Sequence, residues 1–140
     1  MIIIGSFGVM RWLLFIFLSL MFCLHIQAQT DSIHKTYYKS GKLESEMPYV
    51  HGKGNGVYKG YYESGKLQWE ILCINGERNG VDKTYYPSGK LASEYPWTNG
   101  KINGVAKRYY ESGKLKEEAL YFDGQLGEVK QYDEKGNLVK

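Results

Sequence analysis

The sequence predicts an all-β protein, an elongated antiparallel meander of repeated β-hairpins. The first observation is the phrase Tyr-Tyr-x-Ser-Gly-Lys-Leu, which recurs four times at a step of 24 residues, a period typical of stacked supersecondary units. The second is that no window after residue 28 keeps a 3.6-residue apolar period, which argues against helix. The four copies begin at Tyr37, Tyr61, Tyr85 and Tyr109.

Residues 1–28 differ from everything that follows. Residues 12–26 are almost wholly apolar, Arg11 is the only charged side chain before Gln29, and the run ends shortly before Ala28. This pattern predicts a secretory signal peptide that is cut between Ala28 and Gln29. The chain then divides into a signal peptide, residues 1–28, and one repeat domain, residues 29–140.

Two alternatives for this leader stay open. A retained membrane anchor is one, although the apolar run is shorter than the roughly 20 residues that span a bilayer. A lipoprotein signal would need a small residue before Cys23, where Phe22 stands. We expect a protein that is exported, and periplasmic, envelope-associated or secreted, with membrane contact only if the signal is retained.

Charge and cysteine content limit the possible partners of the repeat domain. Without Arg11, the 18 basic side chains fall to 17 against 15 acidic ones, a net charge of +2, which gives no strong attraction for nucleic acid. Cys73 is the one cysteine after the leader, so no internal disulfide can form. We expect Cys73 to be a small buried hydrophobic residue.

The second copy illustrates the predicted hairpin unit. Residues 57–62 and 67–74 are rich in Tyr, Val, Leu and Trp, and each run is bounded by turn residues, as strands are. Residues 63–66, Glu-Ser-Gly-Lys, form a tight turn in which Gly65 supplies a positive φ. Residues 75–80 lead into the next copy.

A two-residue loop in this turn sets a specific register. It places Tyr62 opposite Leu67 and Lys59 opposite Glu70. All four copies then give the same opposite-charge pair, which favours this register. The predicted ladder consists of Lys35 with Glu46, Lys59 with Glu70, Lys83 with Glu94, and Lys107 with Glu118. Its role is strand alignment rather than catalysis, since acid and base groups need dissimilar environments.

Alternation along the strands predicts two different faces. Leu67, Trp69, Ile71 and Cys73 share one face with Tyr62, whereas Tyr61 shares the other with the charge ladder. The aromatic side is the better candidate core, but a single sheet has no second layer to cover it, and Arg108 and Glu117 interrupt it. We therefore expect incomplete burial there.

Three departures from the repeat affect its ends and strands. Residues 129–138 read as a degraded fifth copy, polar enough to cap the sheet. Pro48 and Pro96 stand at matching points of two returning strands. Because proline lacks an N–H group, we expect a bulge or a strand end at both.

No set of residues predicts catalysis, a metal site or a cofactor. His34 and His51 are the only histidines after the leader, and neither lies in a spacing suited to zinc. The serines of the phrase occupy tight turns, and no helix follows the glycine-rich loops to hold a phosphate. The sequence therefore predicts no enzyme.

The phrase and the intervening Asn-Gly-x-x-Asn-Gly-Val blocks, at residues 75–81 and 99–105, resemble the MORN repeat family, in particular its variant bacterial branch. The resemblance covers residues 35–138. It implies a meander of hairpins for protein or lipid contact, without a cofactor. Bacterial members are often labelled antitoxins, a label at odds with a signal peptide. The Tyr-x-Gly of the usual MORN unit remains only at residues 58–60.

The leading prediction is a protein-interaction module or scaffold, because rows of Tyr and Trp form surfaces that seat binding hot spots. The predicted partner-binding residues are Tyr62, Trp69, Tyr86, Tyr95, Trp97, Tyr110 and Tyr121. The partner is an unknown protein or a second copy of the chain. Two other functions stay open: glycan or cell-wall binding through stacked aromatic rings, and immunity against an exported toxin.

Overall fold

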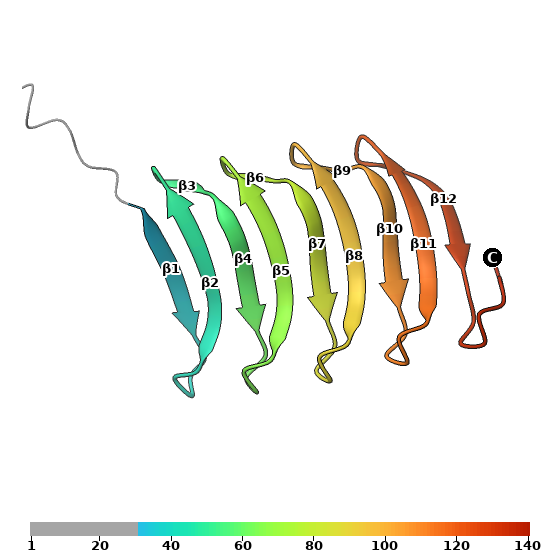
Figure 1. Cartoon of the computed structure of the whole chain (residues 1–140), viewed down its shortest axis with the longest axis horizontal. Coiled ribbons are helices and arrows are strands. Elements are labelled where there is room, and N and C mark those ends of the chain that lie inside the picture. Colours follow the sequence, from blue (N-terminus) through green and yellow to red (C-terminus); the bar gives the residue numbers. More distant parts are fainter. Residues whose placement is uncertain (1–30) are drawn as a thin grey trace, which may run out of the picture.

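The computed structural model describes residues 31–140, which form one open, curved antiparallel sheet (Figure 1). The predicted leader and its cleavage site lie outside the described residues. The strands are β1 (Ser32–Tyr37), β2 (Leu43–Val50), β3 (Lys53–Gly54), β4 (Gly56–Tyr61), β5 (Leu67–Ile74), β6 (Glu77–Arg78), β7 (Gly80–Tyr85), β8 (Leu91–Thr98), β9 (Lys101–Ile102), β10 (Gly104–Tyr109), β11 (Leu115–Phe122) and β12 (Gln125–Gln131). The all-β prediction is confirmed.

Each long strand pairs with its neighbours in sequence, in the order β1-β2-β4-β5-β7-β8-β10-β11-β12. The short strands β3, β6 and β9 pair with β2, β5 and β8 along one margin of the sheet (Figure 1). The degraded fifth copy is ordered too, because Tyr132 forms a β-bridge with Leu138 beyond β12. Residues 31–140 contain no helix that is long and apolar enough to cross a membrane.

The turns of the repeated phrase differ from the prediction. The Tyr62 amide donates to the Lys66 carbonyl at 2.8 Å, and the Gly65 amide donates to the Tyr62 carbonyl at 2.7 Å. These bonds close a three-residue loop in which Gly65 has a φ of 87°. The predicted two-residue loop is therefore wrong at this end of the hairpin. Two-residue turns do occur at the other end, where Asn75 and Gly76 both have positive φ.

A second irregularity compensates for the first. Tyr61, not Tyr62, pairs with Leu67, while Gly60 pairs with Trp69, so Gln68 is an extra residue in β5. The one-residue shift at Gln68 cancels the shift in the turn. Lys59 thus faces Glu70 as predicted, and the same pairing recurs in the other three hairpins.

The expectation for the two prolines holds on one side of each strand only, since the ladder is broken toward the next hairpin and regular toward the strand before it. Pro48 and Pro96 lie inside β2 and β8, in regular register with Ile33 and Val81. The Pro48 and Pro96 carbonyls accept hydrogen bonds from the Asn55 and Asn103 amides. The missing N–H of each proline is on this same side of the strand, where the next strand is interrupted. The break predicted for β2 lies instead between β3 and β4, and that for β8 between β9 and β10.

Glycine is required at these interruptions. Gly56 has a φ of 123°, and a Cβ there would lie 2.8 Å from the ring of Pro48. Gly104 repeats this arrangement with φ 115° against Pro96. The Asn-Gly-Val blocks therefore encode a kink that packs against the returning strand of the preceding hairpin.

The two faces of the sheet differ as predicted, except at the leucine that begins each returning strand, Leu67, Leu91 and Leu115. We define the aromatic face by the side chains that share the side of Trp69 and Trp97, and the charged face by those that share the side of Lys59 and Glu70. Leu67 was predicted on the aromatic face, but it pairs with Tyr61 and so lies on the charged face. The bulge at Gln68 is the physical reason.

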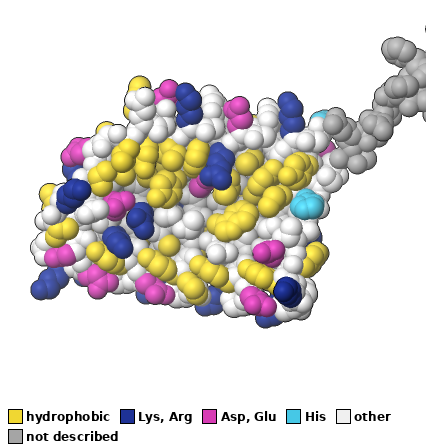
Figure 2. Space-filling view, turned by 180° about the vertical axis from the view of Figure 1, so that it is seen from behind, with side chains coloured by type: hydrophobic (Ala, Val, Ile, Leu, Met, Phe, Trp, Pro, Cys, Tyr) yellow, Lys and Arg dark blue, Asp and Glu magenta, His cyan; other side chains and the backbone are white. Residues whose placement is uncertain are grey.

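Burial is thin over the whole described chain. The buried apolar residues of residues 31–140 are Cys73, Ala106 and Ala119, all on the aromatic face, and no large side chain there is fully buried. Arg108 and Glu117 interrupt this face with an ion pair of 3.8 Å. Figure 2 shows a broad band of hydrophobic side chains across one side of the sheet, in contact with solvent.

The first and third hairpins are alike at one place where the second differs. In the first, Thr36 Oγ1 bonds Ser45 Oγ at 2.7 Å, and in the third, Thr84 Oγ1 bonds Ser93 Oγ at 2.6 Å. At the same place in the second hairpin, Gly60 lies under Trp69, whose ring a Cβ would meet at 2.1 Å. The first and third hairpins thus share small hydroxyl residues where the second packs an aromatic ring on glycine.

Candidate functional site

A groove of about 400 Å³ lies on the aromatic face. Its apolar walls are Trp69 and Ile71 of β5, Tyr95 and Trp97 of β8, and Ile102 of β9. We call these five residues the aromatic groove. The side chains of each wall are two residues apart, so strand alternation alone directs them to one face.

The groove exists because the strand between its walls carries short side chains. On β7, Thr84 pairs with Trp69, and Asp82 pairs with Tyr95. Gly80 of the same strand pairs with Trp97. Two strands that bear large rings thus flank a strand that cannot fill the space between them.

An ion pair lies at one margin of the groove. Arg78 Nη1 donates to Asp82 Oδ2 at 3.1 Å, and the Arg78 guanidinium lies 4.8 Å from the centre of the Trp97 ring, within cation–π range. Asp82 is 8% exposed. Burial raises the pKa of the Asp82 carboxyl, and the positive charge of Arg78 opposes that rise.

Two polar atoms beside this ion pair are unusual. Asp82 Oδ1 and Trp97 Nε1 are both buried, and neither makes a hydrogen bond within residues 31–140. Buried polar groups are nearly always bonded, and an unpaired one costs roughly 1–3 kcal/mol. One acceptor and one donor are thus available for a ligand, provided that Arg78 moves aside.

The structure brings together only part of the predicted partner-binding set. Trp69, Tyr95 and Trp97 line the aromatic groove. Tyr121 pairs with Gly104 on the same face but does not line the groove. That these residues bind a partner remains a prediction.

The other three predicted residues have a structural role. Each lies at the end of a hairpin and donates its hydroxyl to a backbone carbonyl of the following repeat, as Tyr62 does to Tyr85 at 2.6 Å. The remaining bonds of this kind join Tyr38 to Tyr61, Tyr86 to Tyr109, and Tyr110 to Tyr132. These hydroxyls stitch successive hairpins together.

Arg78, Asp82 and Ile102 were not predicted as site residues. The signal for Asp82 is that it is the one acid at its place in the repeat, where the other copies have His34, Tyr58 and Ala106, and an acid on an apolar face is expensive unless it is paired. A search for a basic partner of Asp82 could then have found Arg78, which lies four residues earlier in the sequence, on the other side of the kink at Gly80. Ile102 carries no signal of its own.

The charged face carries one continuous row of alternating charge. Each glutamate of the predicted ladder faces a lysine of its own hairpin and a second lysine of the next, as Glu70 faces Lys59 and Lys83. We call this the charge row. In order across the sheet it runs Lys35, Glu46, Lys59, Glu70, Lys83, Glu94, Lys107, Glu118 and Lys130.

Tyrosine hydroxyls reinforce the charge row. Tyr61 Oη donates to Glu46 at 2.7 Å, Tyr85 to Glu70 at 2.8 Å, and Tyr109 to Glu94 at 2.9 Å. Burial, together with the adjacent carboxylate, raises the pKa of each of these three tyrosines to about 12. The charge row therefore has a structural role, because its glutamates already accept hydrogen bonds from tyrosine hydroxyls.

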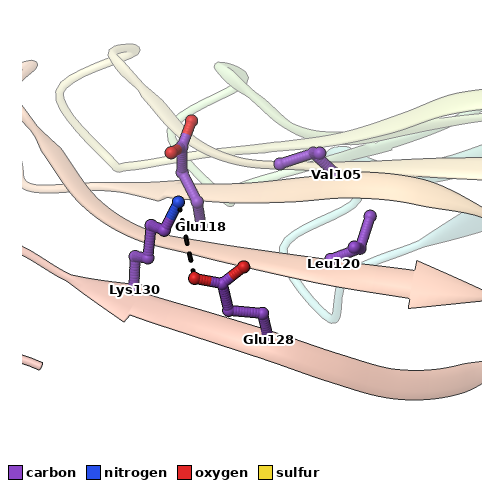
Figure 3. A pocket seen from close by; sticks show the side chains of 5 residues that line it. All are labelled: Val105, Glu118, Leu120, Glu128 and Lys130. Atoms are coloured by element: carbon purple, nitrogen blue, oxygen red, sulfur yellow. Dashed lines mark ion pairs between the residues drawn. The ribbon is translucent and has the colours of Figure 1, made fainter.

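A smaller hollow of about 190 Å³ lies at the far end of the charged face. Val105, Glu118, Leu120, Glu128 and Lys130 line it (Figure 3). Lys130 Nζ lies 3.5 Å from Glu128 Oε1, so the ion pair across its mouth is already satisfied. This hollow offers no apolar surface comparable with the aromatic groove.

Catalytic chemistry finds no support in the described part of the chain. In residues 31–140, no three His, Cys, Asp or Glu side chains come together as metal ligands. Burial raises the pKa of the Cys73 thiol, which keeps it in its unreactive neutral form.

Comparison with known families agrees with this picture. A family model described as MORN repeat variant matches residues 31–51, 55–71, 78–99 and 102–123, and each match includes most of one hairpin. No curated protein matches the chain. Repeats of this type form modules for protein–protein or membrane binding. Because the matches together cover more than half of its length, the chain belongs to the MORN repeat variant family.

Proposed function

We propose that this chain is an exported, non-catalytic interaction module that seats a segment of a partner protein in the aromatic groove. The observation that carries the proposal is the groove itself, about 400 Å³ of space between Trp69 and Trp97 on a sheet with no second layer in residues 31–140. Its rings are only half-buried. Rigid aromatic side chains bind with little loss of conformational entropy, which makes such a surface a good anchor.

The proposed location rests on the leader. Its long apolar run and its end at Ala28 are those of an export signal. A net charge of +2 after removal of the leader fits a partner bound by shape and apolar contact rather than by charge. We therefore place the partner in the cell envelope or outside the cell.

The test compares two double variants of the chain from Gln29 onward. Trp69→Ala with Trp97→Ala removes the walls of the aromatic groove. Val57→Ala with Val81→Ala removes exposed side chains from the charged face and is the matched control. Both must retain the β-sheet circular dichroism of the parent.

We expect the parent and the control to retain one defined protein from envelope extract, and the groove variant to lose it. Titration calorimetry with the purified partner should then show at least a tenfold weaker affinity for the groove variant. Equal retention by all three proteins would refute the proposed site.

A second candidate, glycan binding, is favoured by Asp82 Oδ1 and Trp97 Nε1. A sugar hydroxyl can donate to the carboxylate and accept from the indole while its ring stacks on an aromatic wall. Because Arg78 covers Trp97, this candidate predicts that Arg78→Ala raises the affinity for cell-wall oligosaccharides. Retention of wall fragments by the parent, without any protein, would favour it over the first.

A further inference from the structure

The charge row is incomplete at the edge formed by β1. Lys59 lies between two glutamates, as do Lys83 and Lys107, and all three lysines are half-buried. Lys35 is exposed, and the only glutamate opposite it in the sheet is Glu46 on β2. One acidic partner is therefore missing on the outer side of Lys35, within the described residues.

Tyr37 also lacks hydrogen-bond partners that its counterparts in the other hairpins have. Its counterpart Tyr61 donates its hydroxyl to Glu46 on the preceding strand, and its carbonyl accepts the hydroxyl of Tyr38. Tyr85 and Tyr109 repeat both bonds. Tyr37 makes neither bond within residues 31–140, and its side chain is 58% exposed. One glutamate opposite Lys35 would supply both the missing acid for Lys35 and an acceptor for the Tyr37 hydroxyl.

We infer that β1 is a docking edge for a β-strand of another protein, added antiparallel, with a glutamate opposite Lys35. The neighbours of every interior strand are antiparallel, and the outer N–H and C=O groups of an edge strand provide the backbone bonds for such an addition. The glutamate would bond the Tyr37 hydroxyl and pair with Lys35, which makes this edge selective rather than merely open.

The chain itself supplies no such strand. Residues 1–30 contain neither Asp nor Glu, and Asp31 directly adjoins the first residue of β1, so it cannot turn back to lie opposite Lys35. The strands that carry glutamates of the charge row, β2, β5, β8 and β11, are paired on both sides. A second copy could offer its other edge, β12, which has one glutamate on the charged face, Glu128, but Glu128 already pairs with Lys130 at 3.5 Å and follows Gly127 instead of an aromatic residue. The occupant is thus a different protein.

The likeness of the first and third hairpins predicts one more feature of the incoming strand. The first hairpin matches the third, where Thr84 pairs with Trp69 and Lys83 with Glu70 of the preceding hairpin. By this equivalence, the residue opposite Thr36 is a large aromatic. The partner strand therefore carries an aromatic–glutamate pair, the arrangement of Trp69 and Glu70.

The probe is a synthetic hairpin with the sequence of residues 56–74, in which Cys73→Ser prevents oxidation. It is titrated into the ¹⁵N-labelled chain from Gln29 onward, and amide shifts report where it binds. We expect saturable shifts confined to β1. A hairpin with Glu70→Lys should bind at least tenfold more weakly, because an attractive cross-strand pair becomes a repulsive one.

The decisive experiment reverses both charges. Lys35→Glu should weaken the parent hairpin about tenfold and restore binding of the Glu70→Lys hairpin. Lys130→Glu, on the opposite edge, is the matched control and should change neither. Trp97→Ala should also change neither, which separates this edge from the aromatic groove. Binding that ignores the charge at residue 35, or no shifts at millimolar hairpin, would overturn the inference.

Discussion

Tyr85 Oη donates a 2.8 Å hydrogen bond to Glu70 Oε1, which joins one hairpin to the hairpin before it. The same carboxylate lies 3.8 Å from Lys83 Nζ. Glu70 is thus held by a hydroxyl and an ammonium from the next repeat. Because the sheet has little buried apolar area, bonds of this kind contribute a large share of the cohesion between hairpins.

Loss of this hydroxyl should destabilise the sheet. We expect Tyr85→Phe to lower the free energy of unfolding by about 1–2 kcal/mol, since a hydrogen bond to a charged group is lost. Urea denaturation followed by circular dichroism measures the change. Tyr37→Phe is the control, because Tyr37 has no such partner in the described residues, and it should be nearly neutral. Equal effects of the two substitutions would contradict this role.

Stability should fall at alkaline pH. The folded-state pKa of Tyr61, Tyr85 and Tyr109 is raised to about 12, above the ordinary value of 10.0, so the folded protein holds these protons more tightly than the unfolded chain. Their contribution is complete below pH 10 and is lost as the pH rises toward 12. Ultraviolet titration at the phenolate band should show this late group of tyrosines. A triple Tyr→Phe variant should lose most of this late group and keep Tyr58, whose pKa burial also raises to about 12. Titration of every tyrosine near pH 10 would refute the prediction.

Gly60 and Trp69 should behave as an exchangeable unit. Gly60→Thr should destabilise the protein by about 2–3 kcal/mol, because a Cβ there would overlap the Trp69 ring. Adding Trp69→Ser recreates the pair that Thr84 and Ser93 form in the third hairpin. We expect the double variant to recover most of the loss in thermal denaturation. Independent, additive effects would show that the two side chains do not oppose each other.

Asp82→Asn should stabilise the protein at neutral pH. Burial raises the pKa of Asp82 in the folded state, so the ionised carboxylate opposes folding, and its cost grows as the pH rises through the folded-state pKa. We expect a gain in stability at pH 7 that vanishes below the ordinary pKa of 3.8. Difference curves of stability against pH for parent and variant measure it. A loss at pH 7 would mean that the Arg78 ion pair outweighs the cost of burial.

The sequence was sufficient for the strands and the charge pairs, but not for the turns. Lys59 and Glu70 face each other whether the hairpin has a regular two-residue loop or two irregularities of opposite sense. The charge pattern cannot distinguish the two cases, so the bulge at Gln68 stayed hidden. Leu67 was assigned to the wrong face for this reason alone.

The groove was less accessible from the sequence than the sheet. Its rings were predicted because Trp69, Tyr95 and Trp97 follow the strand period. Its depth depends on the short side chains of β7, and its polar margin on Arg78, which reaches Asp82 across a kink. Contacts of this kind join positions that no repeat pattern links.

The likeness of the first and third hairpins has a consequence for how the length of this protein can change. A duplication or deletion of one repeat would bring two hairpins of the same kind together, for example Ser45 against Thr84, where small side chains would face each other and Trp69 would be missing. Among the first three hairpins, insertion or removal of two repeats at once would keep small side chains opposite the aromatic ring, whereas the fourth hairpin has Arg108 and Glu117 at this place and matches neither kind. Relatives of different length are therefore expected to differ by pairs of repeats, and engineered extensions should follow the same rule.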